Sequence, residues 1–165
     1  MGDSVSLLDG QSEKNKNVFF ICPEYPYDWL YSQNSALWNS GTEESPVKTE
    51  YDPCPEGWRV PTYVELSELS QNRSSWTEND LGQSGYWFSG SSSYSSEAAK
   101  VFFPAAGYRY YYDGDTSRRG GRGYYWSSTP SRSYDDAYGL SFYSGGAHMN
   151  NDYRANGYSV RCVQD

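Results

Sequence analysis

The spacing of apolar residues predicts one helix in this chain. Thr62 followed three residues later by Glu65 is a capping box, in which the two side chains satisfy the free N–H groups at a helix start. Leu66 and Leu69 follow at helical spacing. We therefore expect a helix from Tyr63 to about Gln71.

Short strands are predicted for most of the other apolar runs. Residues 18–22 form an apolar run that stops at Pro23, as a buried strand does. Further runs at 85–90, 98–103 and 124–129 are also typical of strands. The polar stretches between these runs, which are rich in Gly and Pro, are typical of turns.

Alternation predicts a platform of strands near the C-terminus. Large apolar residues take every second position in 138–143, and the pattern recurs around 147–150 and 158–162. Successive side chains of a strand point to opposite faces, so one face of these strands should be buried and the other exposed. The polar tract 108–123 is expected to be a loop beside this platform.

Composition indicates a single domain with an aromatic core. Of the 165 residues 36% are hydrophobic and 18% aromatic, so half of the apolar side chains are rings. We expect 1–17 to be a polar leader or linker and 18–165 to be the domain. No apolar run is as long as a membrane span, and residues 1–4 do not resemble a signal peptide. We therefore expect an excised or processed domain that does not insert into membranes; the alternative is a cytoplasmic protein.

The charge is acidic and unevenly distributed. A formal net charge of −8 argues against nucleic acid as the partner, because phosphate binding needs a basic surface. Every Lys and every Glu lies at or before Lys100, so the two parts of the chain use different sets of amino acids. Three Cys without a Cys-x-x-Cys motif and a single His make a structural zinc site unexpected.

Four ordered motifs resemble a known family. Residues 48–62 (KTEYDPCPEGWRVPT) resemble the opening of the Fibrobacter-succinogenes-type major domain found in surface proteins of gut Bacteroidetes. The motifs at 103–109, 125–129 and 159–163 are similar to its later signatures. The resemblance implies an α+β, C-type-lectin-like fold with one or two helices, related to formylglycine-generating enzymes. The same scaffold carries the variable proteins of diversity-generating retroelements.

The resemblance also implies a disulfide between Cys54 and Cys162. Such a bridge closes a loop of more than a hundred residues, worth on the order of 4–5 kcal/mol in the chain-entropy model. The alternative is two buried free thiols in a reducing cell. Cys22 is expected to be a small buried hydrophobe.

Diversification of this kind leaves a trace in the amino acids used. In these retroelements the adenines of a template are randomised at chosen codons. When both adenines of an AAY codon are randomised, the codon cannot encode Lys, Glu, Gln, Met or Trp. Between Val101 and Val163 there is no Lys, Glu or Gln, and the single Trp and Met there fall at positions predicted to be framework. We therefore expect a variable region at about 104–163. The alternative is a β region rich in Tyr, Ser and Gly with no such history.

Exposed positions of this region are the predicted ligand-binding residues. Tyrosine, arginine and small polar side chains are the usual residues of recognition surfaces. The tyrosines of the set should be exposed, whereas Tyr125, Trp126, Tyr138, Phe142 and Tyr158 should be core. The set comprises Tyr110, Tyr111, Tyr112, Asp113, Asp115, Arg118, Arg119, Arg132, Tyr134, Asp135, Asp136, Tyr143, His148, Asn150, Asn151, Asp152 and Tyr153.

These residues predict a ligand-binding, receptor- or adhesin-type domain and no enzyme. His148 has no nucleophile at a recognisable spacing, and the cysteines predicted to pair do not match an oxidase site. We expect a monomer that binds a protein or cell-surface glycan, outside the cell, on a lipoprotein, a pilus tip or a phage receptor-binding protein.

Two alternatives stay open at this point. The first is a structural cell-envelope domain without a dedicated ligand. The second is a calcium-dependent glycan lectin, although the usual lectin calcium motifs are absent and the Asp residues are typical of solvated turns. We expect no cofactor and no metal.

Overall fold

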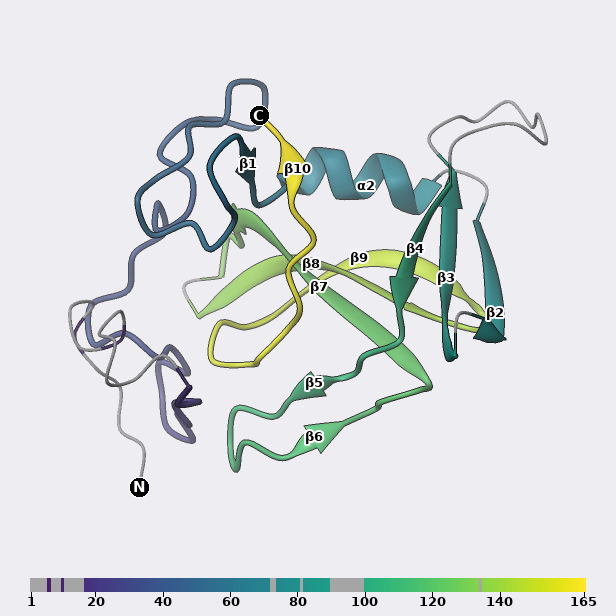
Figure 1. The fold of residues 1–165 in the computed structure, drawn as a ribbon. Helices are drawn as coiled ribbons and strands as arrows, with labels where there is room; N and C mark the ends of the chain where they lie inside the picture. Colours follow the sequence, from purple (N-terminus) through teal and green to yellow (C-terminus); the bar gives the residue numbers. More distant parts are fainter. Residues whose placement is uncertain are drawn as a thin grey trace.

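In the computed structural model the chain is largely β, with one helix of nine residues in the part that is described (Figure 1). The described residues are 6, 10, 17–71, 74–80, 82–89, 100–133 and 135–165. In chain order the elements are β1 (Trp58–Arg59), α2 (Tyr63–Gln71), β2 (Ser74–Asp80), β3 (Gln83–Ser89), β4 (Lys100–Pro104), β5 (Tyr108–Arg109), β6 (Thr116–Ser117), β7 (Arg122–Pro130), β8 (Asp136–Tyr143), β9 (Gly146–Tyr153) and β10 (Val163–Gln164).

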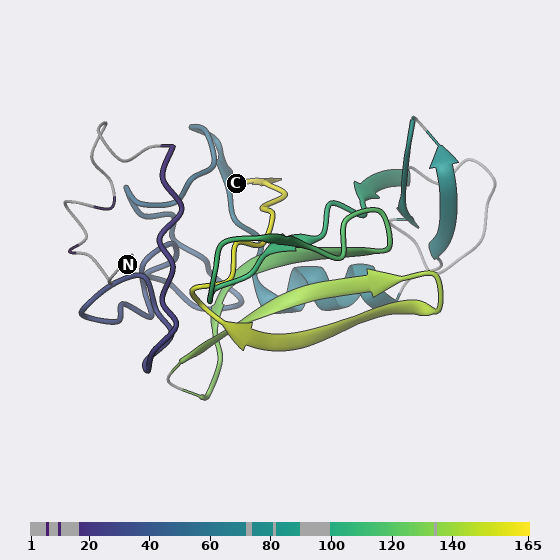
Figure 2. The ribbon, with the colours of Figure 1, turned by 90° about the horizontal axis from the view of Figure 1, so that it is seen from below.

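The strands form four small antiparallel sheets. Their orders are β1-β10, β2-β3-β4, β5-β6 and β7-β8-β9. Helix α2 packs on the β7-β8-β9 sheet, and the sheet β2-β3-β4 lies at one end of the molecule, while the chain from residue 17 to 50 lies at the other (Figures 1 and 2). The expected α+β, C-type-lectin-like class with one or two helices is therefore wrong, because short strands and turns make up nearly all of the regular structure.

Most of the predicted elements are confirmed. Helix α2 has the predicted bounds, and β3, β4, β7, β8 and β9 occur where apolar runs or alternation predicted strands. Residues 18–22 and 158–162, however, do not belong to any strand. The predicted loop 108–123 contains the short hairpin β5-β6, and β2 lies in a stretch expected to be irregular. Most of the predicted leader 1–17 lies outside the described residues.

The main core is a cluster of rings between the sheets. Phe88 of β3, Phe103 of β4 and Phe142 of β8 have ring centroids 5.1 to 6.5 Å apart, mostly edge to face. Leu66 of α2 and Tyr125 of β7 also belong to this buried cluster. Rings of this size bury much apolar surface each, which compensates for the small number of aliphatic residues.

A second cluster covers the other face of the β7-β8-β9 sheet. Trp126 of β7 stacks on Tyr158 at 4.2 Å between ring centroids, and Tyr124 lies 4.9 Å from the same ring. The face of β8 that alternation predicts to be exposed is therefore buried at Ser141, which pairs with Tyr124 of β7. Residues 158–162 form no full strand; Ser159 meets the free edge of β7 in a single parallel bridge with Tyr125.

Of the five rings predicted to be core, four are buried: Tyr125, Trp126, Phe142 and Tyr158. The fifth, Tyr138, is half-buried and packs edge to face on Tyr63 of α2 at 4.8 Å. Within the described part of the chain, no helix has the length and apolar character needed to cross a membrane.

Candidate functional site

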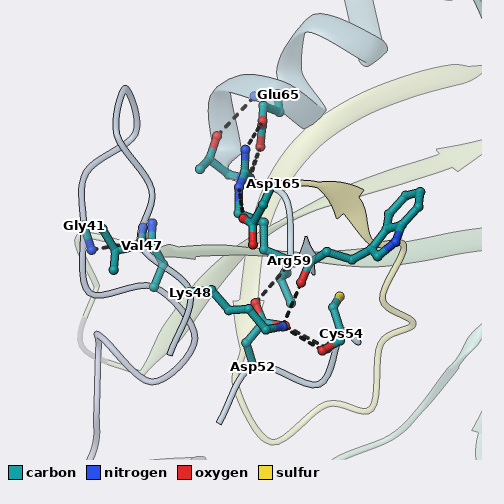
Figure 3. A network of polar contacts seen from close by, with 12 residues as sticks. Gly41, Val47, Lys48, Asp52, Cys54, Arg59, Glu65 and Asp165 are labelled. Carbon is teal, nitrogen blue, oxygen red and sulfur yellow. Dashed lines mark hydrogen bonds and ion pairs between the residues drawn. The ribbon is translucent and has the colours of Figure 1, made fainter. Parts of the chain in front are cut away.

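A polar network holds the C-terminus against the start of helix α2 (Figure 3). Arg59 of β1 donates two hydrogen bonds of 2.7 Å to Glu65, and its Nε lies 3.2 Å from the Asp165 carboxylate. Hydrogen bonding from Arg59 holds the pKa of Glu65 below its ordinary value. Glu65 also accepts the backbone N–H of Thr62 at 2.8 Å, as the capping box predicts.

Asp52 is the second centre of this network (Figure 3). Its buried carboxylate accepts hydrogen bonds from Lys48 Nζ at 2.9 Å and from the N–H groups of Cys54 and Val60 at 2.7 and 2.9 Å. Lys48 also donates to the carbonyl oxygens of Cys54 and Trp58. Buried charges persist only when they are paired and hydrogen-bonded, so this pair organises the loop that carries Cys54.

The predicted disulfide is confirmed. Cys54 and Cys162 are bonded with 5.8 Å between their Cα atoms and a sequence separation of 108. Together with β1-β10, the disulfide fixes the end of the chain to the loop before α2. Cys22 is buried and does not take part in this disulfide.

The structure divides the predicted ligand residues between two ends of the β8-β9 hairpin. Asp136 pairs with Tyr153 at one end, and Tyr143 pairs with Gly146 at the other. At about 3.3 Å per residue, strands of this length separate the two ends by roughly 23 Å. The predicted ligand residues therefore form two groups, one at each end of the hairpin.

Six tyrosines lie ring against ring at the Tyr153 end, and we call them the tyrosine patch: Tyr25, Tyr27, Tyr110, Tyr111, Tyr112 and Tyr153. The ring of Tyr153 lies 4.4 Å from Tyr27 and 5.1 Å from Tyr111. Hydrogen bonding with Tyr110, together with burial, raises the pKa of Tyr111 to about 12. Tyr111 is therefore a neutral hydrogen-bonding group at physiological pH.

Exposure varies across the patch. Tyr25 and Tyr112 are 72% and 58% exposed, whereas Tyr110, Tyr111 and Tyr153 are half-buried. The prediction of exposed tyrosines is thus confirmed at Tyr112 and, at the other end of the hairpin, at Tyr143. It is wrong for those three, because neighbouring rings cover part of each. Tyr134 lies outside the described residues.

Sequence reasoning missed Tyr25 and Tyr27. Tyr27 has a φ of +54°, a conformation that a bulky residue rarely adopts, and its carbonyl accepts the N–H of Ala155 at 2.9 Å. These backbone contacts place the Tyr27 ring against Tyr111 and Tyr153. The only signal in the sequence is a pair of tyrosines flanking Pro26, which does not reveal what they contact.

Acidic residues beside the patch differ in their roles. Asp136 accepts a 2.5 Å hydrogen bond from Asn151, and burial raises the pKa of Asp136. Asp152 accepts hydrogen bonds from Tyr158 Oη at 2.5 Å and from Asn156 Nδ2 at 2.9 Å. The carboxylate of Asp152 is therefore committed to holding the segment that covers the sheet.

The remaining predicted residues at this end are turn residues. Asp113 accepts the N–H of Asp115 at 2.9 Å, which is an Asx turn, and both are exposed. Arg132 is exposed in the connection between β7 and β8, where Asp135 is half-buried.

The Tyr143 end carries a smaller group, which we call the hairpin tip: Arg122, Tyr143 and His148. The Arg122 guanidinium lies 5.1 Å from the Tyr143 ring centroid, and His148 lies 6.2 Å from that ring. Arg118 and Arg119, in the turn after β6, and His148 are exposed, and Asn150 is half-buried. Across the residues that the structure describes, no group of three or more His, Cys, Asp or Glu side chains could hold a metal ion.

A family model supplies the classification. The model of a domain of unknown function, DUF8237, matches residues 50–163, which is more than half of the chain. The chain belongs to this family. Among curated proteins and solved structures, none matches the chain.

The tyrosine patch combines the DUF8237 region with the segment that precedes it. Tyr110–Tyr112 and Tyr153 lie inside residues 50–163, whereas Tyr25 and Tyr27 lie before them. The preceding segment also reaches helix α2, because Glu43 accepts a 3.0 Å hydrogen bond from the N–H of Val64. Residues 17–49 therefore pack on the DUF8237 region and supply part of the candidate site.

Proposed function

We propose that the chain is a non-enzymatic binding domain that recognises a macromolecular ligand through the tyrosine patch. The main support for this proposal is a cluster of six tyrosines in ring contact. Its outermost members, Tyr25 and Tyr112, are more than half exposed. Tyr buries a large area with little loss of rotamer entropy and also offers a hydroxyl, so it dominates recognition surfaces. A protein surface or a cell-surface glycan is the proposed ligand class.

The framework supports this proposal by separating stability from recognition. The disulfide, the Asp52–Lys48 pair and the two aromatic clusters hold the body of the domain. The exposed rings of Tyr25 and Tyr112 lie outside both clusters, so these positions tolerate change. At Tyr112, which lies in the predicted variable region 104–163, such an arrangement suits diversification by a retroelement, which we propose as the origin of the biased composition after Val101.

We further propose that the domain works outside the cell as a monomer. A disulfide that closes a long loop is typical of oxidising compartments, which supports an extracellular or cell-surface site.

A binding experiment tests the tyrosine patch. The labelled 165-residue chain is applied to a printed array of bacterial and mucosal glycans and to an array of surface proteins. Affinity for a captured ligand is then measured for Tyr112→Ala and Tyr25→Ala. Loss of a hot-spot tyrosine costs about 2 kcal/mol or more, so affinity should fall about thirtyfold or more.

Two matched variants complete this test. Tyr31→Ala removes an equally exposed tyrosine that belongs to neither group, and it should leave affinity unchanged. Tyr143→Ala probes the hairpin tip. Binding that survives both patch variants but is lost in Tyr143→Ala would place the site at the other end and refute the proposal.

The diversification claim has its own test in the encoding DNA. A near-copy of the 3′ part of the coding sequence, differing only at adenines and lying beside a reverse transcriptase gene, is the expected finding. A locus without such a copy would contradict diversification and leave the binding claim standing on the affinity data alone.

A further inference from the structure

A cleft of about 600 Å³ lies between the N-terminal segment and the face of the sheet covered by the second aromatic cluster. Trp29 and Trp38 line it from the N-terminal side, and Trp126 and Tyr158 line it from the opposite side. Its volume is in the range of pockets that bind small molecules. None of the residues named here belongs to the tyrosine patch or the hairpin tip.

Aromatic side chains form part of the wall of the cleft. Trp126 and Tyr158 are stacked at 4.2 Å, and the Nε1 of Trp126 donates to the carbonyl of Asn156, so this pair is held rigidly. Trp29 and Trp38 are half-buried, which leaves part of each indole available to a ligand. Flat indole rings offer an apolar face to other ring-shaped molecules.

The ionic groups at the cleft are balanced within the protein. Asp28 is 2% exposed, and its carboxylate lies 3.7 Å from the Arg154 guanidinium. Asp52 is paired with Lys48 at 2.9 Å. Glu50 is exposed at the rim. Because the inner charges are already paired, the interior of the cleft offers nothing that a charged ligand needs.

Hydrogen-bonding groups nevertheless remain for a ligand. Ser128 lines the cleft and is 8% exposed, and within the described part of the chain its hydroxyl has no hydrogen-bond partner. A buried polar group without a partner costs free energy, so a bound partner at Ser128 would be favourable. Asn34 and Tyr51, from two other segments, add further polar groups to the lining.

We propose that this cleft binds a neutral pyranose sugar, as a free saccharide or as the end of a glycan chain. A pyranose ring has apolar C–H faces that stack on indole and hydroxyl groups around its edge. The faces match Trp29 and Trp38, and the edge hydroxyls match polar groups supplied by three separate segments. A fatty chain would leave the Ser128 hydroxyl without a partner, and a charged ligand would meet ion pairs that are already complete.

Saturation-transfer NMR on the 165-residue chain tests the proposal. The probes are the methyl pyranosides of mannose, galactose, glucose and N-acetylglucosamine, with sorbitol as an acyclic polyol and octanoate as an apolar chain. At least one pyranoside should receive saturation transfer, whereas sorbitol and octanoate should not. No transfer to any of the four pyranosides, or equal transfer to sorbitol, overturns the proposal, and so does binding of octanoate alone.

Variants locate the binding site. Ser128→Ala should weaken pyranoside binding about tenfold, and Trp38→Ala should abolish it, with near-UV circular dichroism used to check the fold. If Trp38→Ala does not fold, Ser128→Ala decides. Tyr31→Ala is the matched control and should bind the pyranoside normally, since Tyr31 is exposed and does not line the cleft. Unchanged affinity in Ser128→Ala, or loss of affinity in Tyr112→Ala alone, assigns the sugar to another place and overturns the proposal.

Discussion

Removal of the Cys54–Cys162 disulfide should be among the most destabilising changes in this domain. The bond closes a loop with a sequence separation of 108. In the chain-entropy model a disulfide stabilises the folded state because it lowers the conformational entropy of the unfolded chain. For this loop length the stabilisation is about 4.8 kcal/mol at 25 °C. Small domains are stable by only about 5–15 kcal/mol, so the loss is a third of the total or more.

Urea unfolding followed by fluorescence and circular dichroism measures this loss. The double variant Cys54→Ala/Cys162→Ala is compared with the wild type, and in thermal melts its midpoint temperature should also fall, by roughly 10–20 °C. Cys22→Ala is the matched control, because it removes one buried thiol without opening a loop. Dithiothreitol should destabilise the wild type but leave the double variant unchanged.

A small loss would contradict this reasoning. If the free energy of unfolding falls by less than about 1.5 kcal/mol, the entropy of the 108-residue loop is not what the disulfide contributes. That result would mean that the unfolded chain stays compact without the bond, or that the pairing of β1 with β10 is sufficient to hold the end of the chain in place.

Three further changes test the network and the buried phenol. Asp52→Ala should lower the free energy of unfolding in urea by about 3 kcal/mol, since it leaves the Lys48 ammonium without its carboxylate; a loss below about 1 kcal/mol would contradict this role. The folded pKa of Glu65 is depressed, so its contribution is present above the unfolded pKa and is lost as pH falls through the folded pKa. Thermal melts should therefore show the wild type losing its advantage over Glu65→Gln in acid, and a constant difference would contradict the assignment. Burial raises the pKa of Tyr125 to about 12, so its contribution is full below pH ~10 and is lost as pH rises through the folded pKa. Relative to Tyr125→Phe, the wild type should lose on the order of 2 kcal/mol in urea melts between pH ~10 and ~12, and parallel curves would refute this.

Local signals in the sequence predicted the elements better than the fold class. The capping box of Thr62 and Glu65 and the apolar residues behind it gave the bounds of α2, because a helix start depends on neighbours three residues away. Alternation likewise located β8 and β9. The α+β class came from resemblance, and the largely β arrangement of four small sheets contradicts it.

The candidate site was only partly accessible from the sequence. Composition after Val101 indicated a recognition surface and named Tyr110–Tyr112 and Tyr153. Composition could not show that Tyr25 and Tyr27 join them. Their position depends on contacts between distant parts of the chain, such as the hydrogen bond from the N–H of Ala155 to the carbonyl of Tyr27. Composition also could not show that Asp152 has a structural role, in which its carboxylate accepts hydrogen bonds from Asn156 and Tyr158.

The sequence by itself determined the helix, the main strands and the aromatic character of the core, because these follow from spacing over a few residues. Only the tertiary structure decided which face of the β7-β8-β9 sheet remains exposed. Alternation along β8 predicts an open face at Ser141, but Ser141 pairs with Tyr124, on which the Tyr158 ring packs at 4.9 Å, so this face is buried as well. Burial depends on which distant segment covers a surface, and the periodicity of a single strand does not contain that information.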